Sequence, residues 1–115
     1  DNTIQKAELS FYEKLQKAKI PHYGGADSFA LNGAFAGYGV DYVQLGKATA
    51  DMVDEVLHGG KETATLPVQT FDNGIATVNT DTAEKLGFSM DELKEVFKPY
   101  CTKVEEIKTN QEFAK

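Results

Sequence analysis

Apolar residues recur at steps of three and four over residues 3–18, which predicts an amphipathic helix for this segment. The apolar stripe consists of Ile4, Ala7, Phe11, Leu15 and Ala18. Asp1, Asn2 and Thr3 stand at its start, and each has a side chain that can cap a helix N-terminus. The chain opens on this cap with no initiator Met and no strand before it, so we expect further residues upstream.

Two short β-like runs follow, separated by a polar loop rich in glycine. The runs cover residues 20–23 and 34–38, and the loop contains Gly24, Gly25, Ala26, Asp27 and Ser28. His22 departs from the apolar β-formers expected in the first run, and Gly37 and Gly39 break the second. Loops between regular elements often carry binding residues, so this region is the first candidate for a ligand site.

A second amphipathic helix is predicted from Asp41 to the terminating pair Gly59-Gly60. Its expected inward stripe consists of Leu45, Ala48, Met52, Val53 and Val56. Two strands, "TLPVQTF" at 65–71 and "IATVNT" at 75–80, are then predicted to meet through a tight turn at 72–74.

The last part of the pattern is helical and then weakly ordered. Asp81 with Glu84 and Ser89 with Glu92 each match a capping box, which predicts two short helices separated by Gly87. Residues 98–115 are charged and weakly patterned, so we expect a tail with a possible final helical turn.

Alternation of strands and helices predicts an α/β fold with a largely parallel sheet. Such sheets bind ligands at the carboxyl ends of their strands, where loops meet helix N-termini. Three polar segments could therefore line one rim: residues 1–3, Asp27-Ser28 and Gly37-Tyr38-Gly39.

Composition and charge narrow the function classes. The chain has 115 residues, 41% of them hydrophobic and 26% charged, which is ordinary for a single globular domain. A formal net charge of −6 argues against a nucleic-acid partner, because such surfaces need clustered Lys and Arg. No apolar run approaches the ~20 residues of a membrane-spanning helix, and the N-terminus does not resemble a signal peptide.

Catalytic and metal-binding patterns are not found. The sequence lacks the nucleophile-elbow, phosphate-loop and dinucleotide-binding glycine patterns, so we expect neither an enzyme nor a cofactor. Cys101 has no second cysteine with which to form a disulfide or zinc site. His22 and His58 are interpreted as structural or exposed rather than as metal ligands.

An ordered set of segments carries a resemblance to a known family. These are "DNTIQKAELSFYEKLQKAKIPHYGGADS", "NGAFAGYGVDYVQLGKATADMVDEVLHGGK" and "LPVQTFDNGIATVNTDTAEKLGF". Together they cover roughly residues 1 to 95 and resemble the C-terminal half of ABC-transporter substrate-binding proteins of the tryptophan- and tyrosine-binding type. The Gly-Ala-Asp-Ser motif alone is weak, whereas the combination with the "YGVDY" segment and its following helix is more specific.

The resemblance implies a periplasmic-binding-protein-like fold, in which two α/β lobes joined by a hinge close on a small molecule. It implies that residues 1–97 hold pieces of both lobes and that 98–115 form the charged tail. The hinge crossing would lie near residues 36–40, where Gly37 and Gly39 would give the backbone its freedom. The helix from Asp41 would then belong to the other lobe.

The chemistry of the residues suggests a role for each candidate at such a cleft. Asp27 could accept hydrogen bonds from an α-ammonium group, with Ser28 beside it, and Tyr38 could stack on a ring. Asn2 and Thr3, with the N–H groups at the helix start, could hold a carboxylate. The resemblance itself implies that Asp1 and Asn2 face the cleft. Simpler interpretations stay open: Asp1 as a helix cap, Asp27-Ser28 as a turn or the cap of a short helix, and Tyr38 as a core aromatic.

The implied function is the solute-binding component of an ABC importer, which captures a small molecule and delivers it to a membrane permease. An amino acid is the expected ligand, with aromatic ones first. The protein would be extracellular or periplasmic and anchored as a lipoprotein. The alternative is the effector domain of a bacterial transcription regulator. If the N-terminal part were missing, the helix from Asp41 would lack its packing surface, which favours self-association.

Overall fold

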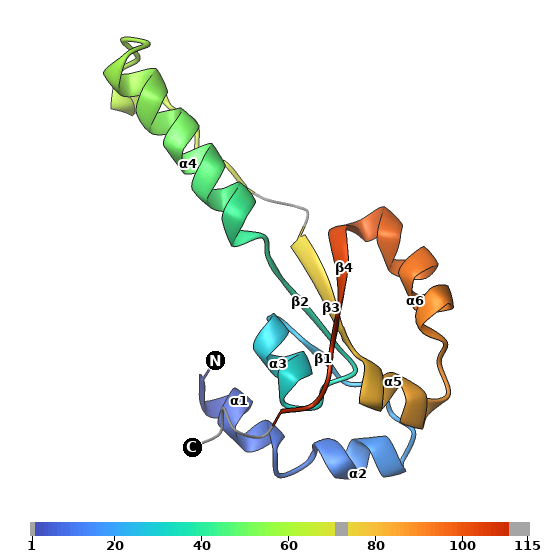
Figure 1. Ribbon diagram of the computed structural model, residues 1–115. Helices are drawn as coiled ribbons and strands as arrows, with labels where there is room; N and C mark the ends of the chain where they lie inside the picture. The colour runs from blue at the N-terminus through green and yellow to red at the C-terminus, as the bar shows by residue number, and fades with distance from the viewer. Residues whose placement is uncertain (1, 71–73, 111–115) are drawn as a thin grey trace.

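The computed structural model describes residues 2–70 and 74–110, which form a mixed α/β body with one projecting arm (Figure 1). The strands are β1 (Tyr23–Gly24), β2 (Ala36–Val40), β3 (Gly74–Asn79) and β4 (Cys101–Ile107). The α-helices are α1 (Asn2–Glu8), α2 (Tyr12–Lys17), α3 (Asp27–Leu31), α4 (Tyr42–Leu57), α5 (Thr80–Leu86) and α6 (Met90–Phe97). Two 3-10 turns, η1 (Thr63–Thr65) and η2 (Lys98–Tyr100), complete the described elements.

The sheet has the strand order β1-β2-β3-β4. β1 pairs with β2 and β3 pairs with β4 in parallel, whereas β2 and β3 are antiparallel. Two of the three pairings are therefore parallel, and helices flank the sheet (Figure 1). The predicted α/β class with a mostly parallel sheet is confirmed.

The hydrophobic core lies between one face of the sheet and helices α5 and α6. Its buried members are Phe35, Ala36, Val78, Ala83 and Leu93. Helix α3 packs on β2 and β3 from the other side, because Ala26 and Asp27 approach β2 directly above Gly37. Strand β1 is shorter than the run predicted at 20–23. Only Tyr23 from that run, together with Gly24 after it, pairs with β2.

The prediction of a single helix over residues 3–18 is wrong. The chain forms two helices, α1 and α2, with a turn between them, and the predicted stripe residue Ile4 is 54% exposed. The side chains that are buried instead are Glu8, Tyr12 and Gln16. Gln16 Nε2 donates a hydrogen bond to Thr82 Oγ1 of α5 at 2.6 Å. This partner allows the polar face of α2 that carries Gln16 to be buried.

Helix α4 begins and ends close to where the sequence predicts. Asp41 is its N-cap, with Oδ1 accepting hydrogen bonds from the amides of Val43 and Gln44 at 3.0 Å each. The expected inward stripe is not buried, because α4 has no buried residue. Figure 1 shows α4 projecting from the body, which gives the molecule extents of 57 × 33 × 19 Å.

The predicted hairpin at 65–80 is only half confirmed. Residues 66–70 form no strand, and the proposed turn at 72–74 lies largely outside the described residues. The second strand exists as β3. Pro67 has no amide hydrogen to donate to a neighbouring strand, and the side chain of Val68 is 93% exposed. Both features disfavour a strand in the first segment.

The two short helices after residue 80 are confirmed, with a different cap for the first. Asn79 is the N-cap of α5, its Oδ1 accepting from the Thr82 amide at 2.9 Å. Ser89 stands at the N-cap of α6 without a side-chain hydrogen bond to it. Gly87 ends α5 with a φ of +88°, a conformation that favours glycine.

Residues 101–107, expected as part of a tail, form strand β4 and pair with β3 along its length. The charged side chains fall on both faces of β4. Glu106 pairs with Lys94 of α6 at 2.5 Å, and Glu105 pairs with Lys103 at 2.6 Å on the opposite face. Within the described part of the chain, no helix is long and apolar enough to cross a membrane.

Candidate functional site

A pocket of about 280 Å³ lies where β2 leaves the sheet and enters α4. Its wall consists of residues 25–27 from the β1–α3 loop, residues 39–43 at the start of α4, Ile75 and Thr77 of β3, and Glu105 of β4. The pocket is thus built at the carboxyl ends of β1 and β2, as expected for a sheet of this kind.

Gly37 lies beneath Ala26 and Asp27, which form one side of this pocket. A Cβ atom at Gly37 would lie 2.1 Å from the Ala26 carbonyl oxygen and 3.2 Å from the Asp27 Cα. The absence of a side chain therefore allows the start of α3 to sit directly on β2, which holds Asp27 at the rim. Asp27 Oδ1 accepts a hydrogen bond from the Ser28 amide at 2.7 Å.

The backbone explanation given for Gly37 and Gly39 needs correction. Neither has a positive φ, and both lie in the regular strand β2. A Cβ at Gly39 would have ordinary contacts, at 3.6 Å from the nearest atoms of the β1–α3 loop. Close packing at Gly37, rather than unusual backbone geometry, is what the structure shows, and the hinge itself stays a prediction.

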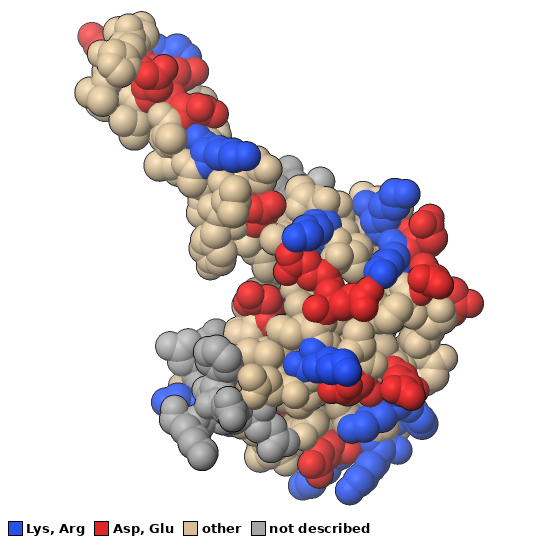
Figure 2. Space-filling model, in the orientation of Figure 1, with Lys and Arg blue, Asp and Glu red and all other residues tan. Residues whose placement is uncertain are grey.

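The pocket is acidic. Asp27, Asp41 and Glu105 line it, and Lys103 stands beside Glu105. The hydrogen bond and charge of Glu105 raise the pKa of Lys103, and the charge of Asp41 acts in the same direction. Figure 2 shows acidic side chains gathered on the face of the body below the base of α4. Such a site attracts cationic groups.

The pocket brings together some of the predicted site residues and not others. Asp27 lines it, but Ser28, Tyr38 and Thr3 do not. Asp1 lies outside the described residues, and Asn2 is the first residue of α1. The roles proposed for residues 1–3 therefore stay predictions.

Tyr38 has a structural environment on the core side of β2. Its hydroxyl accepts a hydrogen bond from the Gly74 amide at 2.7 Å and donates one to the Tyr100 carbonyl at 3.2 Å. Because side chains alternate along a strand, Tyr38 shares the face of Ala36, and Gly37 lies on the opposite face with Gly39, which lines the pocket. This environment supports the core interpretation, and ring stacking on a ligand stays a prediction.

Sequence reasoning missed Thr77 and Glu105, and it recognised Asp41 only as the start of a helix. The one available signal was the alternation in "IATVNT", which places Thr77 opposite the apolar Ala76 and Val78. Nothing comparable marked Glu105, because charged residues occupy both faces of β4.

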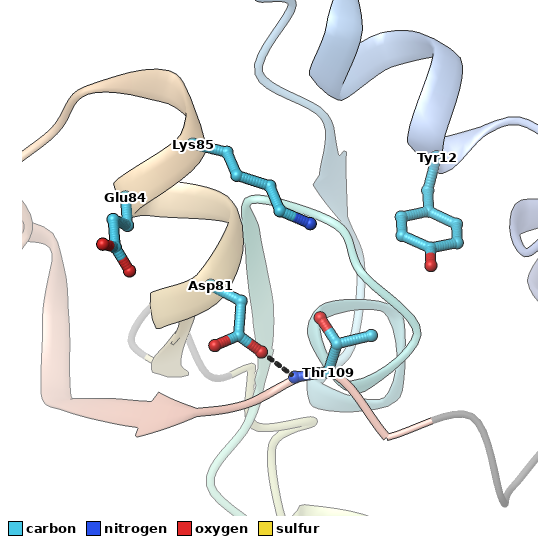
Figure 3. Close-up of a pocket in the computed structure, with 5 residues that line it drawn as sticks. All are labelled: Tyr12, Asp81, Glu84, Lys85 and Thr109. Carbon is cyan, nitrogen blue, oxygen red and sulfur yellow. Dashed lines mark hydrogen bonds between the residues drawn. The ribbon is translucent and has the colours of Figure 1, made fainter.

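A larger hollow, of about 700 Å³, lies at the opposite end of the sheet and is lined by Tyr12, Asp81, Glu84, Lys85 and Thr109. Figure 3 shows Tyr12 and Lys85 on opposite sides of it, with Asp81 reaching the backbone after β4. Asp81 Oδ2 accepts from the Thr109 amide at 3.0 Å, and Lys85 Nζ donates to Gln16 Oε1 at 3.2 Å. These bonds join α2, α5 and the end of β4, so we interpret the hollow as a structural junction.

Glu8 and His22 form a separate titratable pair between α1 and β1. Glu8 is fully buried, and its Oε1 lies 3.3 Å from His22 Nδ1. Burial raises the pKa of Glu8 from 4.5 to about 7, with a hydrogen bond from Asn32 acting in the opposite direction. Burial lowers the pKa of His22. His22 is therefore a structural residue, while His58 is exposed and pairs with Asp54 on α4.

Among residues 2–70 and 74–110, no group of three or more His, Cys, Asp or Glu side chains is arranged to hold a metal ion. Cys101 is buried, and its thiol donates to the Phe97 carbonyl at 3.1 Å.

Comparison with known proteins identifies the family. The family model for ABC transporter substrate binding protein matches residues 1–98. The tyrosine-binding protein of Clostridioides difficile (strain R20291) is 31% identical over 86 residues, which are 75% of this chain and 25% of that protein.

Three solved structures share the fold. The ligand-free, open structure of CD0873, a substrate-binding protein with adhesive properties from Clostridium difficile, is 25% identical with a TM-score of 0.74, over 96% of this chain and 34% of that one. A conserved domain protein from Vibrio cholerae O1 biovar El Tor is 34% identical with a TM-score of 0.56, over 91% and 34%. The ABC domain in complex with L-Trp from Streptococcus pneumoniae is 29% identical with a TM-score of 0.53, over 80% and 31%.

The chain spans about a third of each of these structures and about a quarter of the tyrosine-binding protein. The family match covers most of the chain and agrees with the fold and with a pocket at the carboxyl ends of β1 and β2. The chain therefore belongs to the family of ABC transporter substrate-binding proteins.

Proposed function

We propose that this chain is part of the solute-binding component of an ABC importer whose ligand is an amino acid, with tyrosine and tryptophan as first candidates. The observation that carries the proposal is the acidic pocket in which Asp27 is held over β2. The names of two relatives, one tyrosine-binding and one bound to L-Trp, supply the candidate ligands. No catalytic step is part of this proposal.

The whole protein, in this proposal, has two lobes. The body belongs to one lobe, residues 36–40 form a hinge crossing, and α4 packs in the other lobe. Support comes from the half-exposed stripe of α4, including Leu45, Met52 and Val56, and from the share of the relatives that this chain spans. Without the second lobe, the same stripe would favour self-association.

Asp27 is the proposed acceptor for the ligand's α-ammonium group. Its carboxylate is exposed at the rim, and only the neighbouring Ser28 amide is seen to donate to it within the described residues. Closure of the second lobe would bury this contact, and the ligand's higher affinity for the closed state would drive that closure. The closed form would then deliver the ligand to the permease outside the cytoplasmic membrane, with a lipid anchor holding the protein nearby.

Isothermal titration of the intact protein with L-tyrosine and L-tryptophan tests the proposal. We expect binding of at least one, and Asp27→Ala to weaken it by about 2 kcal/mol, as loss of a charged hydrogen bond should. Asp91→Ala, an exposed carboxylate on α6, is the matched control. If neither amino acid released or absorbed heat on titration, the proposed ligands would be excluded. If Asp27→Ala bound the ligand with unchanged affinity, Asp27 would have a structural role only.

A further inference from the structure

Asp27, Thr77 and Glu105 lie in one row across the outer face of the sheet. Gly37 pairs with Thr77 of β3, and Thr77 pairs with Glu105 of β4. Asp27 lies above Gly37, so the row runs from α3 over three strands. Neighbouring strands are about 4.8 Å apart, which places Thr77 midway between Gly37 and Glu105, whose backbones are about 10 Å apart.

Thr77 is the unusual member of this row. It is a polar residue only 2% exposed, its side chain lines the pocket, and no hydrogen bond of its hydroxyl is seen among the described residues. A buried hydroxyl normally has a partner, because leaving it without one is unfavourable. The Thr77 hydroxyl is not one of the fully enclosed atoms of the described residues that lack a partner, so it opens onto the pocket, where a ligand group can bond to it.

A ligand shares the Glu105 carboxylate with Lys103. Its Oε1 accepts from Lys103 Nζ at 2.6 Å, and the lysine side chain is 64% exposed. An exposed pair of this kind is weak, so a cation that also reaches buried acceptors can replace the lysine. Lys103 then acts as an internal competitor for the same carboxylate.

We propose that Thr77 and Glu105 complete, with Asp27, a subsite for a primary ammonium group of the ligand. A primary ammonium has three N–H donors, and the row offers three acceptors: the Asp27 carboxylate, the Thr77 hydroxyl and the Glu105 carboxylate. This assignment rests on the proposed function for Asp27 and adds the residues that select amines over their deaminated analogues.

The test compares Glu105→Gln with Glu106→Gln. Both changes remove one charge from β4, but Glu106 pairs with Lys94 on the opposite face and does not line the pocket. The probes, titrated calorimetrically into the intact protein, are L-tyrosine, L-tryptophan, tyramine and the deaminated analogue of tyrosine. Circular dichroism would check that each variant is folded.

We expect Glu105→Gln to weaken binding of ammonium-bearing probes at least tenfold, since a charged hydrogen bond is lost. Glu106→Gln should stay within about twofold of the original protein, because surface pairs contribute little. Thr77→Val should weaken binding about fivefold, and Lys103→Met should strengthen it by removing the competitor. The deaminated analogue should bind no better to the original protein than to Glu105→Gln.

The outcomes separate this subsite from the proposed function. Tyrosine binding that is equal in Glu105→Gln and Glu106→Gln would overturn the subsite and leave the amino-acid proposal standing. Tyramine binding that depends on Glu105, without binding of either amino acid, would support the subsite and overturn the amino-acid ligand. Failure of every ammonium-bearing probe to bind would overturn both.

Discussion

Replacing Glu8 with Gln tests how burial of a carboxyl group controls the stability of the α1–β1 contact. Glu8 is 0% exposed and lies 3.3 Å from His22 Nδ1. Burial raises its pKa from 4.5 to about 7 because ionisation in this environment is unfavourable. Gln has almost the same shape and cannot ionise, so the substitution removes the charge and keeps the packing.

The magnitude follows from the pKa values of the folded and unfolded states. The difference between 4.5 and about 7 corresponds to at most about 3.5 kcal/mol, at about 1.4 kcal/mol per pKa unit. The folded pKa is the higher one, so the folded state keeps its proton where the unfolded state has lost it. The free energy of unfolding therefore falls as pH rises from 4.5 to 7, with the contribution of Glu8 fully present below pH 4.5.

His22 acts with the opposite sign. Burial lowers its pKa below 6.5, so its contribution is present above pH 6.5 and is lost as pH falls. In Glu8→Gln only the histidine contribution remains from this pair. We therefore expect the variant to be more stable than the original protein at pH 8, by up to about 3.5 kcal/mol, and to lose the decline between pH 4.5 and 7.

Urea unfolding followed by circular dichroism, from pH 4 to pH 8, measures both effects. Glu84→Gln is the control, because Glu84 is an exposed carboxylate on α5. Its pH profile should match that of the original protein. If Glu8→Gln declined as steeply as the original protein between pH 4.5 and 7, or were less stable at pH 8, the role assigned to burial would be refuted.

Three further predictions concern packing and hydrogen bonds. Gly37→Ala should destabilise the protein by about 1–3 kcal/mol in urea unfolding, because its Cβ would lie 2.1 Å from the Ala26 carbonyl oxygen. Gly39→Ala, with contacts no closer than 3.6 Å, should change stability far less; equal effects would contradict the close-approach explanation. Asn79→Ala should lower the thermal midpoint, since it removes the α5 cap and a buried bond to the Ala30 carbonyl, together about 2 kcal/mol; an unchanged midpoint would argue against the cap. Tyr38→Phe should cost about 1 kcal/mol of stability without changing ligand affinity in calorimetry, because its hydroxyl binds backbone groups; a tenfold loss of affinity would favour ligand contact instead.

Local signals made some elements predictable. Asp41, the apolar period after it and Gly59-Gly60 lie within one short segment, so α4 could be found without tertiary information. Asp27 could be named as a candidate because a polar pair in a glycine-rich loop after a strand is itself a local pattern. Its closeness to β2 depends on Gly37, which the sequence shows only as a glycine.

Elements that depend on distant partners were missed. Gln16 is inward because Thr82 and Gly33 accept its amide hydrogens, and these residues are far away in the sequence. Strand β4 carries Glu105 toward the pocket and Glu106 toward α6, so polar residues occupy both faces and no alternation appears. One of the three acidic residues of the pocket, Glu105, therefore came from a segment that looked like a tail.

The position of α4 between two paired strands affects the order in which this chain can fold. Pairing of β2 with β3 closes a long connection, residues 41–73, that lies between the two strands in the sequence. Loop-closure entropy for a flexible segment of that length is about 3 kcal/mol from the logarithmic term alone. The β1-α3-β2 and β3-α5-α6-β4 segments can each form from contacts close in the sequence, but the β2–β3 ladder must wait until residues 41–73 bring its two strands together. Any partner that orders α4 beforehand would shorten this search, so the folding rate of the body is linked to a surface outside it.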